Sequence, residues 1–358
     1  MTRLSVIIPT HETRALTLRC VGSVLASGAR GESGEGSEGV DGEAVEIVVV
    51  DDASSDGTVQ ALREKYPQVR VEVLAARSGF TVAVNRGLAA ASGEVLLLLN
   101  SDTVVEPGVL AALSACFAER GELGAVGAQL LDPDGAAQWS GGREPTLAWL
   151  FVLAADLAPA LARLPGYRRR RPLGAAWLRP VDWVTGAALG LRRSAWEAVG
   201  PFDEGFLFYG QDLDYCCRLR RAGWGVAIDP RVRVVHERGA TIGRVAGATE
   251  GRNLALLFSD LELWGRKQRG PRWAAAARLV LRAGAGLRLR RRWRGFVGSA
   301  ERRRAWRGER AAVRAALLAL REGPPPRARI ESMGREGIAE EGVRARPDPS
   351  ELSRDARR

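Results

Sequence analysis

The first hundred residues alternate short apolar runs with longer segments of helical character. Buried strands are predicted at 4–8, 46–50 and 94–99, an alternating strand at 69–74, and helices at 14 to about 25 and at 78–91. A β-α-β-α-β order of this kind is typical of a parallel, doubly wound α/β sheet with its chemistry at the carboxyl ends of the strands. The stretch 28–44, rich in Gly, Glu and Ser, predicts an exposed flexible loop.

The pattern is less regular further along the chain. Glu106-Pro107 is expected to open another helix, because proline is well placed in a first helical turn. Strand-like runs return at 187–191 and 226–235. The segment 140–182 has no clear period, although 151–164 is amphipathic. We expect substrate specificity to reside in this irregular segment and in the loops around 203–210.

The net charge of +11 is unevenly distributed. Residues 259–358 hold 26 basic and 12 acidic residues, whereas the rest of the chain holds 27 and 30. A near-neutral body therefore carries a strongly basic C-terminal appendage. Hydrophobic residues make up 46% of the chain, which is enough for a buried core and excludes global disorder.

The basic appendage has two parts. We predict a basic helical extension over 259–322 and a disordered polar tail over 323–358. Within 265–314, 17 basic residues occur with only two acidic ones, interleaved with Trp273, Trp293, Phe296 and Trp306. Such a segment can contact nucleic acid or anionic lipid headgroups, or it can be a solvated basic helix. Peripheral contact with an anionic membrane is favoured, and nucleic acid is disfavoured.

Cysteine spacing and hydropathy indicate the compartment. The four cysteines form no CxxC pair and no metal-binding spacing, so they are expected to be reduced thiols. No uncharged apolar run reaches the length of a membrane span, and the run before Pro9 is too short for a signal peptide. A cytoplasmic location is expected, with peripheral attachment at the inner face of the plasma membrane.

Acidic residues follow the predicted strands. Asp51 and Asp52 close the second strand, and Asp102 follows the strand at 94–99. Carboxylates gathered at one edge of a parallel sheet repel one another unless a cation or hydrogen-bond donors lie between them. A divalent ion that holds a nucleoside diphosphate would supply that cation. The alternative is plain helix capping, which we favour for Asp56.

Other features narrow the chemistry. The loop Pro9-Thr10-His11-Glu12 contains no glycine, which argues against a dinucleotide-binding Rossmann domain. Asp212 and Asp214 stand at the start of a predicted helix, where an acid is stabilised as the anion and can serve as a general base, or where it simply caps the helix. His236 ends a strand-like run and is either a metal ligand or structural, whereas His11 is taken as structural.

Six segments in order carry a resemblance to a known family. They are LSVIIPTHE, VVVDDASSDGT, RSGFTVAVNRGL, LLLLNSD, WVTGAALGLRRSAWEAVGPFDEGFLFYGQDLDYCCRLRRAGW and VVHERG. This series resembles the family 2 glycosyltransferases with the GT-A fold, and within them the rhamnosyltransferase-like branch that acts on cell-surface glycans. The resemblance covers about 4–240 and leaves out the basic C-terminal region. It implies a glycosyltransferase domain over 1–258, with nucleotide-sugar binding in about 1–130 and the acceptor and catalytic part in about 131–258.

The resemblance also implies roles for particular residues. Asp212 stands at the catalytic-base position, with Gln211 where relatives usually have Glu. Asp102 stands at the metal-facing position of the DxD motif, and His236 is a further metal contact for Mg²⁺ or Mn²⁺. The implied donor-binding residues are Pro9, Thr10, Glu12, Asp51, Arg77, Asn85, Asn100, Ser101, Asp102, Trp183, Gly186 and Ala187. Among these, Arg77 stands where relatives often have Asn, and Asn100 replaces the first acid of the motif.

The implied reaction is an inverting sugar transfer. Asp212 would take the proton of an acceptor hydroxyl as it attacks the anomeric carbon of dTDP-rhamnose or a similar pyrimidine-nucleotide hexose. The acceptor would be a cell-surface glycan or a lipid-linked sugar. Two alternatives remain. A sugar-nucleotide nucleotidyltransferase would need a Gly-rich basic loop after the first strand, which PTHE lacks. A non-catalytic protein could bind polyanions or a membrane surface through 265–314.

Overall fold

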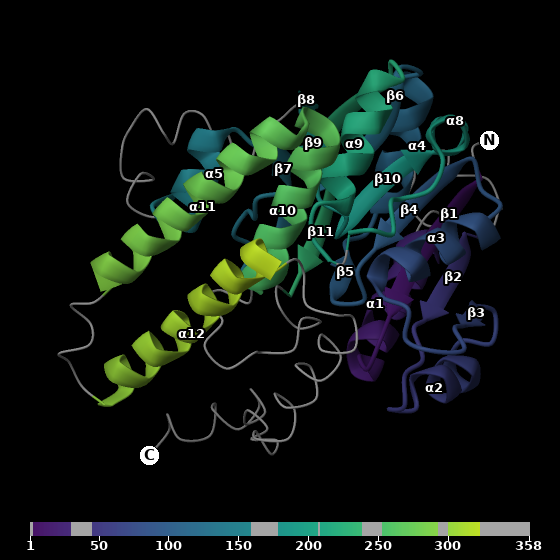
Figure 1. The fold of residues 1–358 in the computed structure, drawn as a ribbon. Helices are drawn as coiled ribbons and strands as arrows, with labels where there is room; N and C mark the ends of the chain where they lie inside the picture. The colour runs from purple at the N-terminus through teal and green to yellow at the C-terminus, as the bar shows by residue number, and fades with distance from the viewer. Residues whose placement is uncertain are drawn as a thin grey trace, which may run out of the picture.

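The computed structural model describes residues 3–29, 45–158, 178–206, 208–237, 253–292 and 300–322. Its centre is a mixed sheet with the strand order β3-β2-β1-β4-β10-β6-β11-β5, and β8 pairs with β11. Helices cover both faces of this sheet, and further helices form a separate layer beside it (Figure 1). The fold class predicted from the sequence is therefore confirmed.

The half of the sheet for which the sequence predicts nucleotide binding, called the nucleotide half, is wholly parallel. Its strands are β1 (Leu4–Thr10), β2 (Glu46–Asp51), β3 (Arg70–Val73) and β4 (Val95–Leu99). The helices between them are α1 (Arg14–Ala29), α2 (Thr58–Lys65) and α3 (Phe80–Ala90). The predicted elements all form here. The register pairs Thr10 with Asp51, so the carboxyl ends of β1 and β2 meet at one edge.

The second half of the sheet mixes directions. Its main strands are β5 (Thr103–Val105), β6 (Leu123–Leu131), β10 (Ala188–Arg192) and β11 (Gly225–His236). The antiparallel strand β10 lies between β4 and β6, and joins the two halves. The short strand β8 (Arg179–Pro180) pairs with β11, whereas β7 (Gly141–Gly142) and β9 (Trp183–Val184) form a separate two-stranded sheet. The predicted strands at 187–191 and 226–235 are β10 and β11, whereas β5 and β6 were not predicted.

The helices of this half are α4 (Val109–Glu119), α8 (Arg193–Val199) and α9 (Gln211–Arg221). The helix expected to open at Glu106-Pro107 begins instead at Val109, after Gly108, which adopts a left-handed conformation. Pro107 therefore precedes the helix rather than occupying its first turn. The expected capping role of Asp56 is present, because its carboxylate accepts hydrogen bonds from the Arg14 and Thr58 amides.

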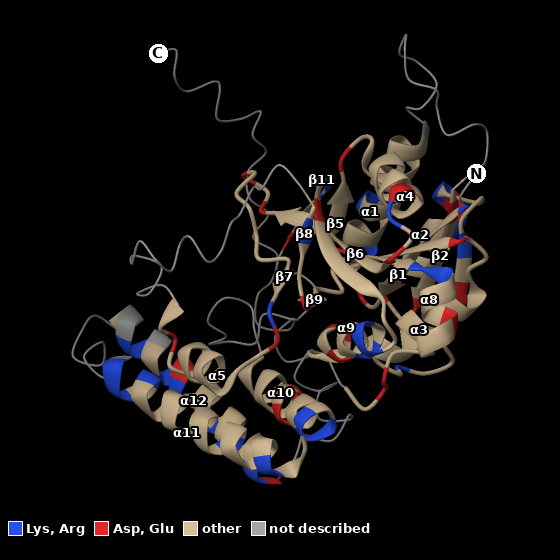
Figure 2. Ribbon diagram, turned by 90° about the horizontal axis from the view of Figure 1, so that it is seen from above, with Lys and Arg blue, Asp and Glu red and all other residues tan. Residues whose placement is uncertain are grey.

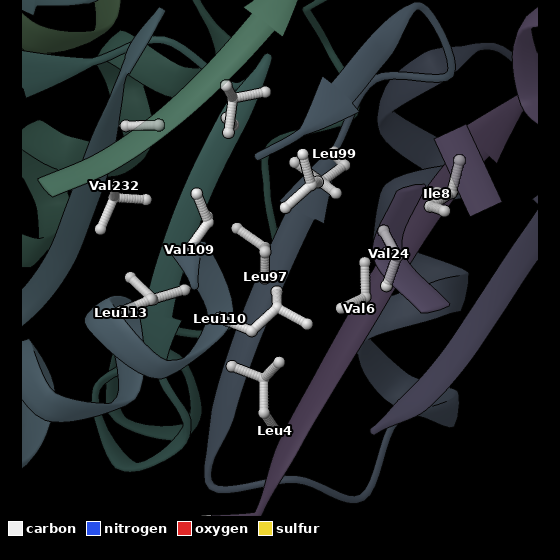
Figure 3. Packing of buried hydrophobic residues seen from close by; sticks show 14 of the residues in the cluster. Leu4, Val6, Ile8, Val24, Leu97, Leu99, Val109, Leu110, Leu113 and Val232 are labelled. Carbon is white, nitrogen blue, oxygen red and sulfur yellow. The ribbon is translucent and has the colours of Figure 1, made fainter. Parts of the chain in front are cut away.

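Two apolar cores sandwich the sheet. On one face, alternate residues of β1 pack with β4, α1 and α4, and Figure 3 shows part of this cluster, including Leu4, Val6, Leu97 and Leu113. On the other face, the intervening β1 residue Ile7 packs with α3, α9 and β10. Burial on both faces explains why these strands read as continuous apolar runs. All four cysteines are unpaired and buried in these packed regions.

The C-terminal helices share a third core with α5 (Leu147–Ala154) and α9. They are α10 (Leu254–Arg269), α11 (Pro271–Arg292) and α12 (Ala300–Glu322), and they pack with α5. Leu213 and Cys217 of α9 belong to the same cluster. The boundary expected between 258 and 259 falls inside α10, so the helical extension is continuous with the rest of the molecule.

Three of the predicted segments lie partly or wholly outside the described residues. The amphipathic stretch predicted over 151–164 begins in α5, which ends at Ala154, and residues 159–164 lie outside the described part. The predicted loop at 28–44 and tail at 323–358 likewise lie largely outside it. Among the described residues, no helix is both long enough and apolar enough to cross a lipid bilayer.

Candidate functional site

The residues singled out from the sequence gather at the carboxyl edge of the parallel strands. Asp51 ends β2 and is fully buried. One of its oxygens, Oδ2, accepts a hydrogen bond from the Ser54 amide at 2.8 Å, whereas Oδ1 has no hydrogen-bond partner in the described part of the chain. A buried carboxylate oxygen without a donor is costly, and an N–H group of a ligand that reached this atom would satisfy it.

The loops after β1 and β2 hold each other in an unusual conformation. Glu12 and Ala53 both have positive φ angles, 52° and 57°, which residues other than glycine seldom adopt. The Glu12 carboxylate accepts hydrogen bonds from the Ser55 amide at 2.7 Å and from the Ser55 hydroxyl at 2.9 Å. Because such backbone strain persists only where surrounding contacts enforce it, the two loops form a fixed edge of the site.

The side chains of Thr10 and Ser101 point away from that edge. The Thr10 hydroxyl lies 2.8 Å from the Thr13 hydroxyl and 2.6 Å from the Thr17 hydroxyl, and Thr13 in turn contacts Ser101 at 3.0 Å. All four hydroxyl groups are buried. Pro9 is buried within β1. These residues fix the geometry of the two strand ends, and their backbone rather than their side chains borders the site.

Asp52 fixes the loop that leads into α3. Its two carboxylate oxygens accept hydrogen bonds from the Ser78 amide at 2.6 Å and the Gly79 amide at 2.8 Å. His11 Nδ1 lies 2.7 Å from the Asp52 carbonyl oxygen, in line with the structural role expected of this histidine. Arg77 lies in the loop that Asp52 holds.

Asn85 lies elsewhere. It is in the second turn of α3, and its amide group bonds to the backbone of Phe202, accepting from N at 2.9 Å and donating to O at 2.9 Å. It also donates to Glu204. Its hydrogen-bonding capacity is thus used to hold the segment after α8 against α3. The structure does not group Asn85 with the other expected donor-binding residues, because that helix turn faces the second half of the sheet.

A cavity of about 250 Å³ lies where the two halves of the sheet meet. Asn100, Asp102, Asp212 and His236 line it, although they come from distant parts of the chain. Asp102 Oδ1 is 3.5 Å from His236 Nε2, an ion pair when the imidazole is protonated. Strand pairing between β11 and β5 sets this approach, because the register places His236 opposite Thr103.

Gln138 orients the imidazole of His236. The amide nitrogen of Gln138 donates to the Leu131 carbonyl, the Asp132 carboxylate and the His236 carbonyl, at 3.1, 2.8 and 2.6 Å. Those acceptors fix the amide, so its oxygen faces His236 Nδ1 at 3.1 Å and accepts a hydrogen bond from the Nδ1–H group. In the neutral imidazole, Nε2 then presents its lone pair towards Asp102.

This pair of side chains fits a divalent cation that a diphosphate also holds. A carboxylate and an imidazole lone pair converge on one point, and Gln138 supplies the outer hydrogen bond that metal-binding histidines usually make. Within the described part of the chain, no group of three or more His, Cys, Asp or Glu side chains could hold a metal. The protein would therefore supply two ligands, and the substrate and water the others.

Asp212 is held at the start of α9. Its Oδ2 accepts a hydrogen bond from the Gly186 amide at 2.9 Å, and its Oδ1 accepts from the Leu213 amide at 2.7 Å. Burial raises the pKa of this carboxyl group above its usual range, and the two backbone hydrogen bonds offset part of the rise. A carboxylate with a raised pKa is a stronger base. Asp214, by contrast, pairs with Arg218 at 2.9 Å and is not part of the cavity.

The remaining expected residues border Asp212. The Ala187 carbonyl accepts from the Asn100 amide at 3.0 Å, which joins β10 to the end of β4. Gly186 and Ala187 therefore form the floor between Asp102 and Asp212. Trp183 also lines the cavity, and its indole nitrogen donates to the Arg143 carbonyl at 3.1 Å.

Asp260 of α10 is a positioning residue that sequence reasoning missed. It is buried, and its Oδ2 accepts hydrogen bonds from the Phe208 amide at 3.1 Å and the Tyr209 amide at 2.7 Å. These residues lead directly into Gly210, whose φ of 79° turns the chain into α9. A helix assigned to the basic extension thus fixes the segment that places Asp212. The signal in the sequence was an acid within the apolar run of 254–264.

Glu144 ties the irregular segment to the same helices. Its carboxylate accepts a hydrogen bond from Arg220 of α9 at 2.7 Å and forms a second ion pair with Arg269 of α10. The Glu144 amide also donates to Asp182. Two arginines near the cavity are therefore neutralised by carboxylates of the protein itself.

We expect Asp260→Ala to loosen the entry to α9 specifically. The two amides of Phe208 and Tyr209 would lose a buried acceptor, which costs about 1–3 kcal/mol and corresponds to about 5- to 150-fold faster local hydrogen exchange. Exchange of the peptide 206–212, followed by mass spectrometry, measures this. Glu262→Ala is the matched control, because Glu262 is a buried acid on the same helix that pairs with Arg266. Equal exchange in both variants would contradict the positioning role.

Comparison with known proteins supports the geometry. The family model described as "Glycosyl transferase family 2" matches residues 5–195. N-acetylglucosaminyl-diphospho-decaprenol L-rhamnosyltransferase of Mycobacterium tuberculosis is 32% identical over 258 residues, which cover 68% of this chain and 82% of that protein. The O-antigen biosynthesis protein RfbC of Myxococcus xanthus is 34% identical over 200 residues, 55% of this chain and 15% of that protein.

A solved structure shows the same fold. It is the mannosyltransferase PcManGT from Pyrobaculum calidifontis in complex with GDP-Man and Mn²⁺, which superimposes with a TM-score of 0.54 at 18% sequence identity. The match covers 90% of this chain and 88% of that one. It therefore extends beyond the range of the family model and includes the region of the C-terminal helices.

Proposed function

This chain belongs to glycosyl transferase family 2, and we propose that it transfers rhamnose or a similar hexose, with inversion, from a pyrimidine nucleoside diphosphate to a hydroxyl group of a cell-surface glycan or lipid-linked acceptor. The observation that carries the proposal is the convergence of Asp212, Asp102 and His236 on one cavity at the carboxyl edge of the sheet. The family assignment decides against the nucleotidyltransferase and the purely non-catalytic alternatives. The relative from M. tuberculosis, named as a rhamnosyltransferase, supports the sugar.

The nucleotide edge supports a uracil or thymine base. Asp51 Oδ1 is a buried acceptor without a donor in the described part of the chain. The N3 position of uracil or thymine carries a hydrogen and can donate to it, whereas N3 of cytosine is an acceptor. The strained loops at Glu12 and Ala53 and the loop held by Asp52 would border the bound base. Arg77 on the latter loop would contact the nucleotide.

Asp102 and His236 would hold Mg²⁺ or Mn²⁺ together with the diphosphate. The bound cation would stabilise the negative charge of the departing nucleoside diphosphate. The protein contributes the orientation of the two ligands: Gln138 fixes the imidazole, and the Glu237 amide donates to the Asp102 carbonyl at 3.0 Å. The solved relative in complex with GDP-Man and Mn²⁺ supports such a site.

Asp212 would remove the proton from the acceptor hydroxyl. Its carboxylate lines the cavity and is held from two sides by backbone amides, so it cannot swing away when a ligand enters. The raised pKa of the Asp212 carboxyl group lies closer to the pKa of the acceptor hydroxyl group, whose proton it must accept. A base that activates the acceptor while the diphosphate leaves from the opposite side produces one displacement and inversion at the anomeric carbon.

The Arg-rich helices support peripheral attachment to an anionic membrane. Exposed residues form one stripe on α11, with Arg272, Leu279, Arg282 and Arg290, and another on α12, with Arg307, Arg314, Leu318 and Arg321. Leu279 is 71% exposed and Leu318 47%. Figure 2 shows Lys and Arg, in blue, spaced along both helices. Arginines that flank an exposed leucine suit a surface of anionic headgroups.

The function is tested by nucleoside diphosphate release from a panel of sugar nucleotides with Mn²⁺ or Mg²⁺. We expect metal-dependent release from a dTDP- or UDP-linked donor. In Asp212→Asn, transfer to an acceptor should fall by about 10²- to 10⁴-fold, because the general base is lost. Asp102→Ala should abolish the response to metal. Asp214→Asn is the matched control on the same helix turn. Metal-independent transfer, or full transfer by Asp212→Asn, would contradict the proposal.

Membrane attachment is tested with point variants, because removal of the helices would also remove part of the core beside Asp212. Arg282→Glu/Arg314→Glu should lower partition onto phosphatidylglycerol vesicles at least about 30-fold, at about 1 kcal/mol for each arginine. Leu279→Ser/Leu318→Ser should lower it further. Val73→Ser alters a third exposed hydrophobic side chain, on β3, and should have no effect. Unchanged vesicle binding by both double variants would sink the attachment hypothesis.

A further inference from the structure

The cavity continues past Asp212 to a wall of three tryptophans. We propose that this wall, together with the side-chain amide of Gln211, binds the acceptor as a neutral pyranose whose apolar face packs on the indole rings. The inference rests on the proposed function, and it adds the position and the chemical class of the acceptor sugar. Trp139, Trp149 and Trp183 all line the cavity.

The three indoles support one another. The rings of Trp139 and Trp183 meet edge to face with centroids 5.0 Å apart, and those of Trp139 and Trp149 are 6.0 Å apart. Trp149 lies in the first turn of α5, whose N-cap Thr146 accepts a hydrogen bond from the Trp149 amide at 3.1 Å. A rigid aromatic surface with open ring area suits a ligand that has an apolar face.

Gln211 supplies a polar contact beside this surface. Its side chain is only 6% exposed and lines the cavity, and Oε1 has no hydrogen-bond partner in the described part of the chain. A buried amide oxygen without a donor calls for a ligand donor. A sugar hydroxyl fits, because it can donate to the amide oxygen and accept from the amide nitrogen. Asp212 is the next residue, so a hydroxyl bound by Gln211 brings its neighbours close to the base.

The charges around the cavity select a neutral sugar. Its lining includes the carboxylates of Asp102 and Asp212 but no Arg or Lys from the described residues. Arg220 and Arg269, which lie nearby, already pair with Glu144. The proposed divalent cation is already held by Asp102, His236 and the diphosphate, so a uronic acid carboxylate on the ring that reacts would meet the Asp212 carboxylate in a buried setting where the described lining offers no Arg or Lys. Any phosphate of a lipid carrier must lie outside the cavity.

Trp139 and Trp149 are distinct from the residues assigned to the donor, whereas Trp183 is also one of those residues. The diphosphate would lie with Asp102 and His236, and the base with Asp51, which does not line this cavity. Leu153 of α5 and Leu257 and Leu261 of α10 extend the apolar lining beyond the tryptophans. These helices do not belong to the nucleotide half of the sheet. An effect of Trp149 on acceptor binding but not on donor binding is therefore the distinguishing property.

The test uses the full chain and matched pairs of p-nitrophenyl glycosides. Glucoside is compared with glucuronide and galactoside with galacturonide, and N-acetylglucosaminide is added as a second neutral class. Titration calorimetry in the presence of UDP or dTDP and Mn²⁺ measures binding without turnover. We expect neutral glycosides to bind and uronides to bind at least tenfold more weakly. Trp149→Ala should raise the acceptor Kd about tenfold, and Trp149→Phe should recover most of the loss. Trp196→Ala, outside the cavity, is the control.

Donor turnover separates this inference from the proposed function. Trp149→Ala should leave the KM for donor hydrolysis unchanged, because Trp149 lies on α5 and is not among the residues assigned to the donor. The inference is overturned if uronides bind as well as neutral glycosides, if no neutral glycoside binds, or if Trp149→Ala raises the donor KM instead of the acceptor Kd. In each of those cases metal-dependent donor hydrolysis by the wild type would leave the proposed function standing. Absence of that hydrolysis from every donor would instead overturn the proposed function.

Discussion

The burial of one carboxylate at the start of a helix is the constraint on which the rest of this structure depends. Asp212 is 9% exposed, and in that setting its ionised form is stabilised by two backbone amides, from Gly186 and Leu213. Gly186 lies between β9 and β10, so the central antiparallel strand must be in register before Asp212 is held correctly. The burial that would strengthen Asp212 as the proposed base also penalises its charge, so it affects both stability and chemistry.

That constraint explains why helices far along the chain belong to the active site. Asp260 on α10 holds the amides of Phe208 and Tyr209, and the core shared by α9, α10, α11 and α12 fixes α10 against α9. Two of these helices, α11 and α12, carry arginine stripes on their exposed side. One layer of the protein can thus position the base on its inner face and present a basic surface on its outer face. A lipid-linked acceptor would approach the cavity from such a surface.

The parts of this site that follow a local rule could be predicted from the sequence. Strand ends rich in acids, the acid pair at the start of a helix and the ordered family motifs are enough to single out Asp51, Asp102, Asp212 and His236. The nucleotide half of the sheet was predictable for the same reason, because its apolar runs are short, regular and separated by helices.

The parts that depend on distant contacts were not predictable. Asp260 contacts residues about fifty positions away, and Gln138 contacts His236, which is 98 positions further along the chain. Nothing near Trp139 or Trp149 in the sequence indicates that their rings meet. Asn85 shows the converse, since a matching motif position faces Phe202 rather than the nucleotide edge. Side-chain direction within a helix and pairing across the sheet decide these cases, and neither has a local signature.

The most direct test of this account is the pH dependence of kcat/KM for sugar transfer. Because transfer requires ionised Asp212 and burial raises its pKa, activity should fall on the acid side around a midpoint above the value of about 3.9 for an unperturbed aspartate. The fall should approach tenfold per pH unit and be absent from the residual activity of Asp212→Asn. Circular dichroism over the same range confirms that the fold is intact. A midpoint at or below about 3.9, or an identical acid limb in Asp212→Asn, would contradict the assignment of Asp212 as the base.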